Sequence, residues 1–205
     1  MWKSRNPHLW QSSSLTDTRP DMDEKRILEL IEHEEGLQQA FNLIIRTYSE
    51  RLYLTIRRMV NCHEDADDIL QDTFIKVWNA IPTFRGDSGI YTWIFRIALN
   101  TTLTFLRKEK ARAFLSLTNY EAYVDSRMVG DDSFDGNELQ RLLHKAISLL
   151  PPKQRLVFTL RYFEEMPYER IAEALGGTTG SLKASYHHAY VKITQWLKQN
   201  NCHPE

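Results

Sequence analysis

The chain has 205 residues, of which 42% are apolar, and its 26 basic and 27 acidic residues leave a net charge of −1. This length allows one or two domains, and no apolar run reaches the roughly 18 residues that a membrane-spanning helix needs, so we expect no membrane insertion. Because the two cysteines, Cys62 and Cys202, lie far apart and lack the spacing of a zinc site, we expect free thiols, no metal and a cytoplasmic location.

The first segment, residues 1–21, is polar and aperiodic, which is typical of a disordered tail or of an extension upstream of the true start at Met22. Beyond it, apolar residues recur at the spacing of helices that bury one face. The pattern predicts three consecutive helices, at about 23–34, 37–60 and 64–81.

The third of these helices is acidic at its start, because residues 64, 65, 67, 68 and 72 are acids and no base falls among them. Its apolar residues, Ile69 among them, form the face expected to be buried and leave Asp68, Gln71, Asp72, Ile75 and Asn79 outward. A solvated face is the usual role of such a run. Acids repel DNA phosphates, so a functional interpretation requires a basic protein partner.

A loop at residues 84–89 precedes a long helix predicted at about 90–111, for which Asp87 or Ser88 is available as the N-cap. Trp93 lies near the loop, at the edge of a polar stripe of this helix. An aromatic ring beside cations and an amide is what unstacked single-stranded bases bind, whereas the alternative is that Trp93 belongs to the core. The stripe consists of Arg96, Asn100, Thr104, Arg107 and Lys108.

The stretch after this helix has no sustained periodicity, and residues 113–138 carry six acids against one base. We therefore expect residues 113–137 to be a flexible acidic linker between two domains, at 22–112 and 138–200. The second domain begins with predicted helices at about 138–150 and 153–163. Since no strand pattern or internal repeat occurs, the predicted fold class is all-α with two small helical domains.

The last forty residues predict a helix-turn-helix. A short helix at about 167–175 is followed by Gly176 and Gly177, which tolerate the left-handed backbone of a helix C-terminus. Thr178 can then cap a second helix, which has no acid before Lys198 and whose outer face is small, polar and cationic. Such a face suits a DNA major groove, although an ordinary helix pair of a small bundle shares part of the pattern. The candidate DNA contacts are Thr178, Ser181, Lys183, Ala184, Ser185, His187 and His188.

Two stretches of the sequence together resemble a known family. They are Asp-Asp-Ile-Leu-Gln-Asp-Thr-Phe-Ile-Lys-Val-Trp, from Asp67, and Phe-Arg-Gly-Asp-Ser-Gly-Ile-Tyr-Thr-Trp-Ile-Phe-Arg-Ile-Ala-Leu-Asn, from Phe84. With them, roughly residues 37–197 are similar to the extracytoplasmic-function sigma factors, the group-four branch of the sigma-70 family. The stretch 183–189 further resembles the version found in Bacteroidetes.

The resemblance implies a sigma factor that directs core RNA polymerase to promoters and helps to open the duplex, without enzymatic chemistry or a cofactor. It implies that the partner is core RNA polymerase, through its β′ clamp helices and its β subunit. The residues that would contact the clamp helices are Asp68, Ile69, Gln71, Asp72 and Phe74. A flipped base and the melted strand of the minus-ten element would be held by Arg85, Gly86, Asp87, Ser88, Trp93, Arg96, Asn100, Arg107 and Lys108.

The same resemblance assigns the second helix of the helix-turn-helix to the minus-thirty-five element, although many relatives carry arginines where this chain has Ser185 and His188. It also implies an anti-sigma factor, commonly membrane-anchored. The alternative function is a stand-alone helix-turn-helix transcriptional regulator, which leaves the acidic helix and the Trp93 stripe unexplained. No nucleophile–base pair, phosphate loop or metal spacing in the sequence indicates an enzyme.

Overall fold

The computed structural model describes residues 20–115, 119–128 and 138–200, and all regular structure in these ranges is helical, which confirms the predicted fold class. The first helices are α1 (Pro20–Ile31), α2 (Leu37–Arg57), α3 (His63–Ala80) and α4 (Ile90–Leu115), with short 3-10 turns at η2 (Glu34–Gly36) and η3 (Ile81–Thr83). The later helices are α5 (Tyr120–Met128), α6 (Glu138–Ser148), α7 (Pro152–Tyr162), α8 (Tyr168–Leu175) and α9 (Thr179–Gln199). Of the predicted tail, residues 1–19 lie outside the described residues.

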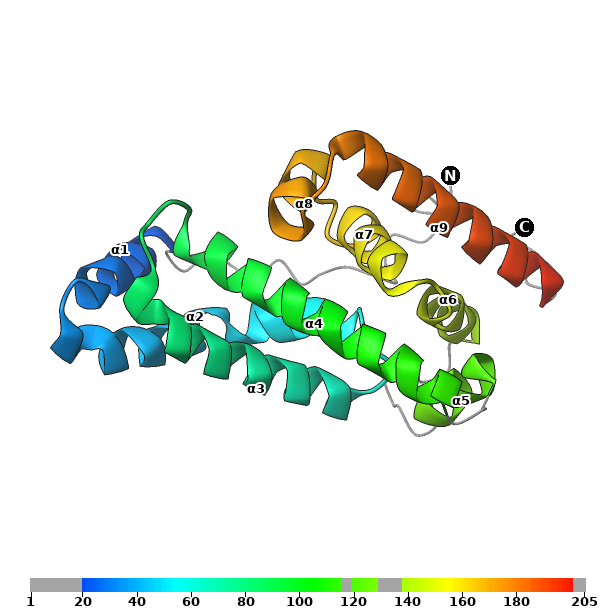
Figure 1. Cartoon of the computed structure of the whole chain (residues 1–205), viewed down its shortest axis with the longest axis horizontal. Coiled ribbons are helices and arrows are strands. Elements are labelled where there is room, and N and C mark those ends of the chain that lie inside the picture. The colour runs from blue at the N-terminus through cyan, green and yellow to red at the C-terminus, as the bar shows by residue number, and fades with distance from the viewer. Residues whose placement is uncertain (1–19, 116–118, 129–137, 201–205) are drawn as a thin grey trace.

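The N-terminal unit, α1 to α4, forms because each helix has an apolar stripe that the others cover. Figure 1 shows α2, α3 and α4 lying side by side with α1 against the start of α2. Fully buried side chains such as Ile44, Leu52, Ile94 and Leu99 fill the space between the helices. Burying each of them stabilises the fold by about 1.5–3 kcal/mol.

The C-terminal unit, α6 to α9, has a second core. Phe158 of α7 lies at its centre and stacks on Tyr162 and on Tyr186 of α9, with ring centroids 5.1 and 5.5 Å apart. Around it pack side chains from α6, the following turn and α9, namely Leu143, Ala146, Ile147, Leu150, Ala189 and Ile193.

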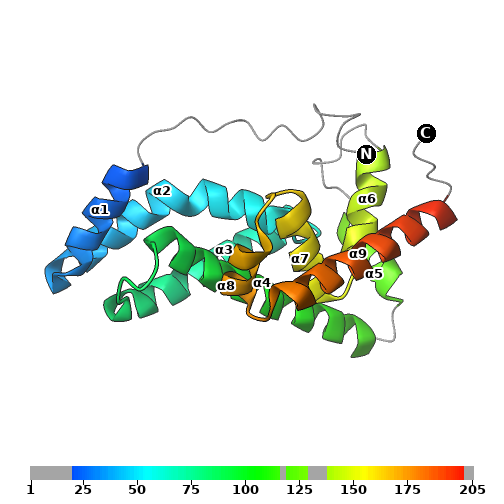
Figure 2. The same cartoon turned by 90° about the horizontal axis from the view of Figure 1, so that it is seen from above.

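The two units are packed against each other. Figures 1 and 2 show α7 and α8 lying over α4, with α9 on the side of α7 and α8 away from α4. Leu156, Val157 and Leu160 of α7 and Ile171 of α8 belong to the same buried cluster as the core of the N-terminal unit. The structure is therefore one closed body in which α4 supports both units.

The flexible linker predicted at residues 113–137 is wrong for the part that the structure describes. Helix α4 runs on to Leu115, and α5 packs with Val124 and Met128 buried. Two acids of the predicted linker, Glu121 and Asp125, pair with Lys145 of α6 at 3.1 and 2.8 Å. These ion pairs hold α5 against α6. No short-range pattern in the sequence indicates them, because the partners are 20 or more residues apart.

Candidate nucleic-acid and protein interfaces

The start of α9 is held by a capping box. The amide of Ser181 donates to Thr178 Oγ1 at 3.2 Å, and the amide of Thr178 donates to Ser181 Oγ at 3.3 Å. Gly176 and Gly177, with φ of 72° and 101°, adopt the left-handed backbone expected between the two helices. The predicted turn and cap are confirmed. Both hydroxyl side chains serve the helix start, which leaves them less free to bind DNA.

The predicted recognition face of α9 is exposed. Leu182, Ala189 and Ile193 face the core, as the periodicity indicates. Lys183, Ala184, His187 and His188 are exposed on the other side, and Ser185 is half-buried. Sequence reasoning missed Tyr190, which is 55% exposed one helical turn beyond His187. An exposed aromatic ring at helical spacing from the cations is the signal that could have found it.

The stripe predicted on α4 is also exposed along its whole length. Its five members, Arg96, Asn100, Thr104, Arg107 and Lys108, are all solvent-exposed, although neighbouring positions such as Leu103 and Leu106 are buried. Three cations with an amide and a hydroxyl therefore form one polar surface about 18 Å long, at the 1.5 Å rise of a helix. Such a surface can track a phosphate backbone and hydrogen-bond to bases.

Trp93 is predicted either to stack on unstacked bases or to belong to the core, and its surroundings have features of both. Its indole is half-buried and packs at 51° on the ring of Phe84, with centroids 5.0 Å apart. The loop beside it exposes Arg85, Gly86 and Asp87, and Ser88 is half-buried. Trp93 is thus a supported ring at the surface rather than a fully buried core residue.

The beginning of α4 is capped differently from the prediction. The amide of Ile90 donates to Glu24 Oε1 of α1 at 2.8 Å, so this cap comes from 66 residues earlier instead of from Asp87 or Ser88. Sequence reasoning missed Glu24 because a cap from a distant helix has no local spacing. Its position next to the loop at residues 84–89 makes it part of the same surface.

The acidic face of α3, defined by Asp68, Gln71 and Asp72, is exposed as expected. The implied contact through Ile69 is wrong, because this side chain is 1% exposed and packs in the core. Its spacing with the other apolar residues of α3 already indicated burial. Phe74 is half-buried and reaches the surface.

An apolar groove adjoins this acidic face. It has a volume of about 480 Å³ and lies between α2 and α3. Ile75 and Trp78 are 53% and 39% exposed there, and Phe41 packs edge-on to Trp78 with ring centroids 5.0 Å apart. Exposed apolar side chains ringed by polar ones mark a surface that a protein partner covers. The groove is lined by Gln38, Phe41, Ile45, Gln71, Phe74, Ile75 and Trp78.

A buried network joins the two units where α7 meets the α2–α3 connection. Arg155 of α7 is fully buried, donates to Asn61 Oδ1 at 2.9 Å, and Asn61 Nδ2 donates to Glu109 Oε1 of α4 at 3.1 Å. Burial raises the pKa of Glu109 and lowers the pKa of Arg155. Each charged form therefore has a desolvation cost, which the opposite charge of the other reduces.

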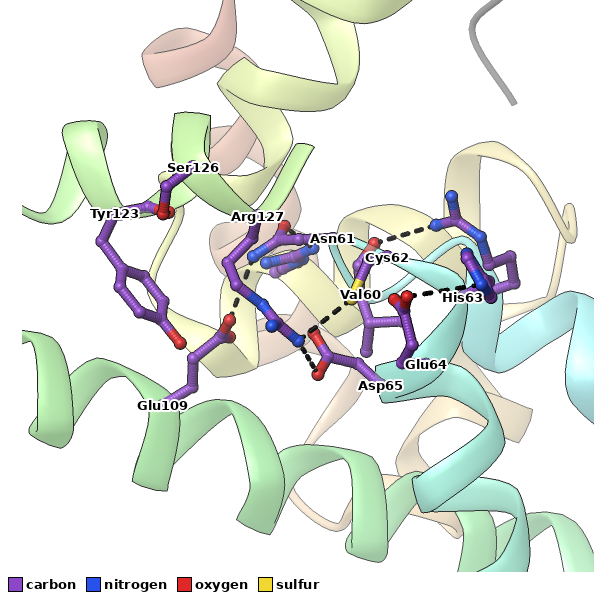
Figure 3. A network of polar contacts seen from close by, with 12 residues as sticks. Val60, Asn61, Cys62, His63, Glu64, Asp65, Glu109, Tyr123, Ser126 and Arg127 are labelled. Atoms are coloured by element: carbon purple, nitrogen blue, oxygen red, sulfur yellow. Dashed lines mark hydrogen bonds and ion pairs between the residues drawn. The ribbon is translucent and has the colours of Figure 1, made fainter. Parts of the chain in front are cut away.

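A second polar group continues this network toward α5. Figure 3 shows Arg127 reaching both Asp65, with which it forms an ion pair, and the sulfur of Cys62, which is 3.0 Å from Arg127 Nη2. Burial is the main cause that raises the pKa of the Cys62 thiol to about 12. Cys62 is a free buried thiol, as predicted, whereas Cys202 lies outside the described residues.

Across the three described ranges, no helix is long and apolar enough to cross a membrane. The same residues contain no group of three or more His, Cys, Asp or Glu side chains that could hold a metal ion.

Comparison with known families gives two matches that divide the chain as the helical units do. Residues 44–112 match Sigma-70 region 2, and residues 140–193 match Sigma-70, region 4. The first match ends within α4, and the second covers nearly all of α6 to α9.

Individual relatives are similar over most of their length. The chain is 31% identical over 159 residues to the ECF RNA polymerase sigma-E factor of Haemophilus influenzae, covering 74% of this chain and 84% of that protein. It is 30% identical over 185 residues to the ECF RNA polymerase sigma factor SigW of Bacillus subtilis, covering 86% and 97%. The fold is similar, at a TM-score of 0.54 and 22% identity over 77% of this chain and 96% of the other, to the sigma factor RpoE crystallised with the anti-sigma factor NepR from Bartonella quintana.

Proposed function

Because the chain belongs to the extracytoplasmic-function sigma factors of the sigma-70 family, and so directs RNA polymerase to promoters at transcription initiation, we propose that three exposed faces divide this work. The acidic face of α3 binds core polymerase, the stripe of α4 holds the minus-ten element, and α9 reads the minus-thirty-five element. The observation that carries this proposal is the separation of charge, since acids gather on the exposed face of α3 and cations on those of α4 and α9.

The polymerase-binding face combines charge with an apolar anchor. Asp68 and Asp72 offer exposed carboxylates that repel DNA and attract a basic protein surface. Phe74 and Trp78 line the groove next to them. Interfaces are typically anchored by aromatic side chains in such grooves, with charges at the rim. We propose that the β′ clamp helices bind here, and that Phe41, Ile45, Ile75 and Trp78 join Asp68, Gln71, Asp72 and Phe74 in the contact.

The minus-ten face is suited to a single strand. The cations at Arg96, Arg107 and Lys108 follow one side of α4, and Trp93 offers a supported ring at the end nearest the loop. Stacking of a base on an aromatic ring contributes on the order of 1–3 kcal/mol. We propose that the loop, with Arg85, Gly86, Asp87 and Ser88, captures a flipped base, and that Asn100 and the cations hold the strand beyond it.

The minus-thirty-five face is the outer side of α9. Lys183, Ala184, His187 and His188 are the exposed candidates for DNA contact, and Ser185 lies at their edge. Small residues allow the helix to approach base edges, while Lys183 contacts phosphate. Thr178 and Ser181 are proposed to act mainly by holding the start of the helix where its free amides face the DNA backbone.

Charge reversal on α3 tests the proposal. Asp68→Arg with Asp72→Arg should abolish co-elution with purified core polymerase and promoter-directed transcription in vitro, while leaving the helical circular dichroism unchanged. The matched control, Glu32→Arg with Glu35→Arg, makes the same change in charge at exposed acids near η2 and should bind normally. Unchanged co-elution of the α3 variant, or equal loss in both variants, would contradict the assigned face.

The regulator and the setting are proposed from the relatives. The Bartonella sigma factor is seen bound to an anti-sigma factor, and we propose that this chain also has one, which covers the acidic face of α3. We place the protein in the bacterial cytoplasm, where polymerase and promoters lie, and assign it to the Bacteroidetes branch on residues 183–189. A stand-alone regulator is not supported, since it would not account for the match to region 2.

A further inference from the structure

Helix α1 contacts the loop that precedes α4 through one carboxylate. Glu24 is half-buried, and its Oε1 accepts a hydrogen bond from the amide of Ile90 at 2.8 Å. The same oxygen lies 3.0 Å from where a Cβ atom on Gly89 would stand. The last residue of the loop and the first residue of α4 therefore both lie against Glu24.

This contact satisfies a general need of a helix start. The first amides of a helix have no partner within the helix, and a carboxylate there stabilises both the amides and the positive end of the helix dipole. Glu24 supplies the acceptor for Ile90, and Asp87 in the loop is exposed. The side chains of Arg85 and Asp87 in the loop are therefore available to contact DNA.

The part of α1 that carries Glu24 is packed against its neighbours. Ile27, one turn further along α1, is fully buried, and Gly36 ends the α1–α2 turn so close to Leu30 that a Cβ atom would lie 2.3 Å from its carbonyl oxygen. On the α4 side, Tyr91 packs on Tyr48 of α2 with ring centroids 5.3 Å apart. Burial and then the charge of Glu24 raise the pKa of Tyr48 to about 12, so α1, α2 and the start of α4 share one compact junction.

From this geometry we propose that Glu24 is a positioning residue for base capture: it fixes the loop at residues 84–89 in the shape that holds the flipped base of the minus-ten strand. This inference rests on the proposed function of the loop. It makes α1 part of promoter selectivity, although α1 carries none of the exposed cations proposed to contact DNA. Loss of Glu24 should loosen the loop. The affinity for a strand with the base present should then differ less from the affinity for a strand in which that base is missing.

The experiment uses holoenzyme assembled from core polymerase and the full chain. A single strand is first recovered from a pool of randomised single-stranded DNA by binding to this holoenzyme. Fluorescently labelled copies of that strand, intact or with one abasic site at each position in turn, are then the probes. For each position, the dissociation constant of the abasic strand is divided by that of the intact strand. This ratio, at the position where it is largest, measures base capture.

Glu24→Ala should lower this ratio on the order of fivefold, as expected for the loss of one cap hydrogen bond. Glu24→Gln, which keeps an acceptor oxygen, should retain most of it, and the control Glu29→Ala, on an exposed part of α1, should match the parent. Circular dichroism checks that each variant is folded.

An unchanged ratio in Glu24→Ala, including the case in which intact and abasic strands both bind more weakly by the same factor, would overturn the positioning role. Equal losses in Glu24→Ala and Glu24→Gln would overturn the hydrogen bond as its cause. If the parent holoenzyme showed no position sensitive to an abasic site, the proposed function of the loop would fail instead.

Discussion

Replacing Arg155 by methionine tests the buried network that joins the two helical units. Methionine keeps much of the side-chain volume, but Asn61 Oδ1 loses its donor and Glu109 loses the positive charge that most lowers its pKa. Arg155 and Glu109 are joined through Asn61, and leaving a buried polar or charged group without its partner costs about 1–3 kcal/mol. Since 1 kcal/mol lowers the Tm of a protein of this size by about 2–4 °C, we expect a fall of roughly 2–12 °C.

The second arm of the test removes the charge of Glu109. Glu109→Gln keeps an acceptor for Asn61, so the hydrogen bond of 3.1 Å can persist. Because burial disfavours the ionised form of Glu109, the double variant with Arg155→Met should recover much of the lost stability. Urea denaturation of the parent, both single variants and the double variant should give a coupling free energy of about 1–3 kcal/mol.

The control is Arg141→Met, which makes the same substitution in the exposed pair with Glu138. Exposed pairs of this kind contribute little to stability because solvent screens their charges, so its Tm should change little. Equal effects of Arg141→Met and Arg155→Met, or strictly additive effects of Arg155→Met and Glu109→Gln, would refute the reasoning.

The contribution of Glu109 to the stability of the folded protein should depend on pH, and its direction follows from the pKa of this residue. The pKa of Glu109 is raised in the folded protein, mainly by burial, so the folded state holds this proton more tightly than the unfolded chain. The resulting stabilisation is complete below the unfolded pKa of about 4.3 and is lost as pH rises through the higher folded pKa. The stability of the parent minus that of Glu109→Gln should therefore decrease with rising pH, and an increase would contradict the assigned cause.

Three further changes test separate features. Trp93→Ala should impair promoter opening, read by permanganate footprinting, more than closed-complex formation, and equal losses would exclude a stacking role. Gly177→Ala should cost about 1–3 kcal/mol because φ is 101°, whereas Gly180→Ala inside α9 should not destabilise the protein in thermal melts. Since burial raises the pKa of Cys62 to about 12, folded Cys202→Ser protein should react with a thiol reagent at pH 8 far more slowly than the unfolded chain; similar rates would contradict this.

Local patterns in the sequence were enough for most of the fold. The apolar spacing of α2, α3 and α9 predicts their buried faces, and the glycines with Thr178 predict the turn before α9. These features depend on residues within one or two turns of each other. Ile69 shows the limit of transferring roles by resemblance, because its position on the apolar stripe already placed it in the core.

The sequence did not predict the contacts between distant segments. Glu24 caps α4 across 66 residues, and Arg155 reaches Asn61 across 94. In the sequence, Glu24 looks like one more surface acid of α1, and Arg155 looks like a solvated cation of α7. Only the folded arrangement brings their partners close, and it also turns the expected linker into the packed helix α5.

The contacts between the two helical units also determine how easily the units can separate. In the region of the described residues where the units meet, Glu109 Oε2, Arg155 Nε and Arg127 Nε are buried without hydrogen-bond partners. A polar network left partly unsatisfied is weaker than an apolar contact of the same area. The interface between the units thus combines an apolar part, from Leu156 and Ile171, with a polar part in which the loss of one partner leaves the others buried and unpaired. Arg155→Met should therefore shift the population toward open forms, which would appear as a larger radius of gyration in small-angle scattering at temperatures below the transition.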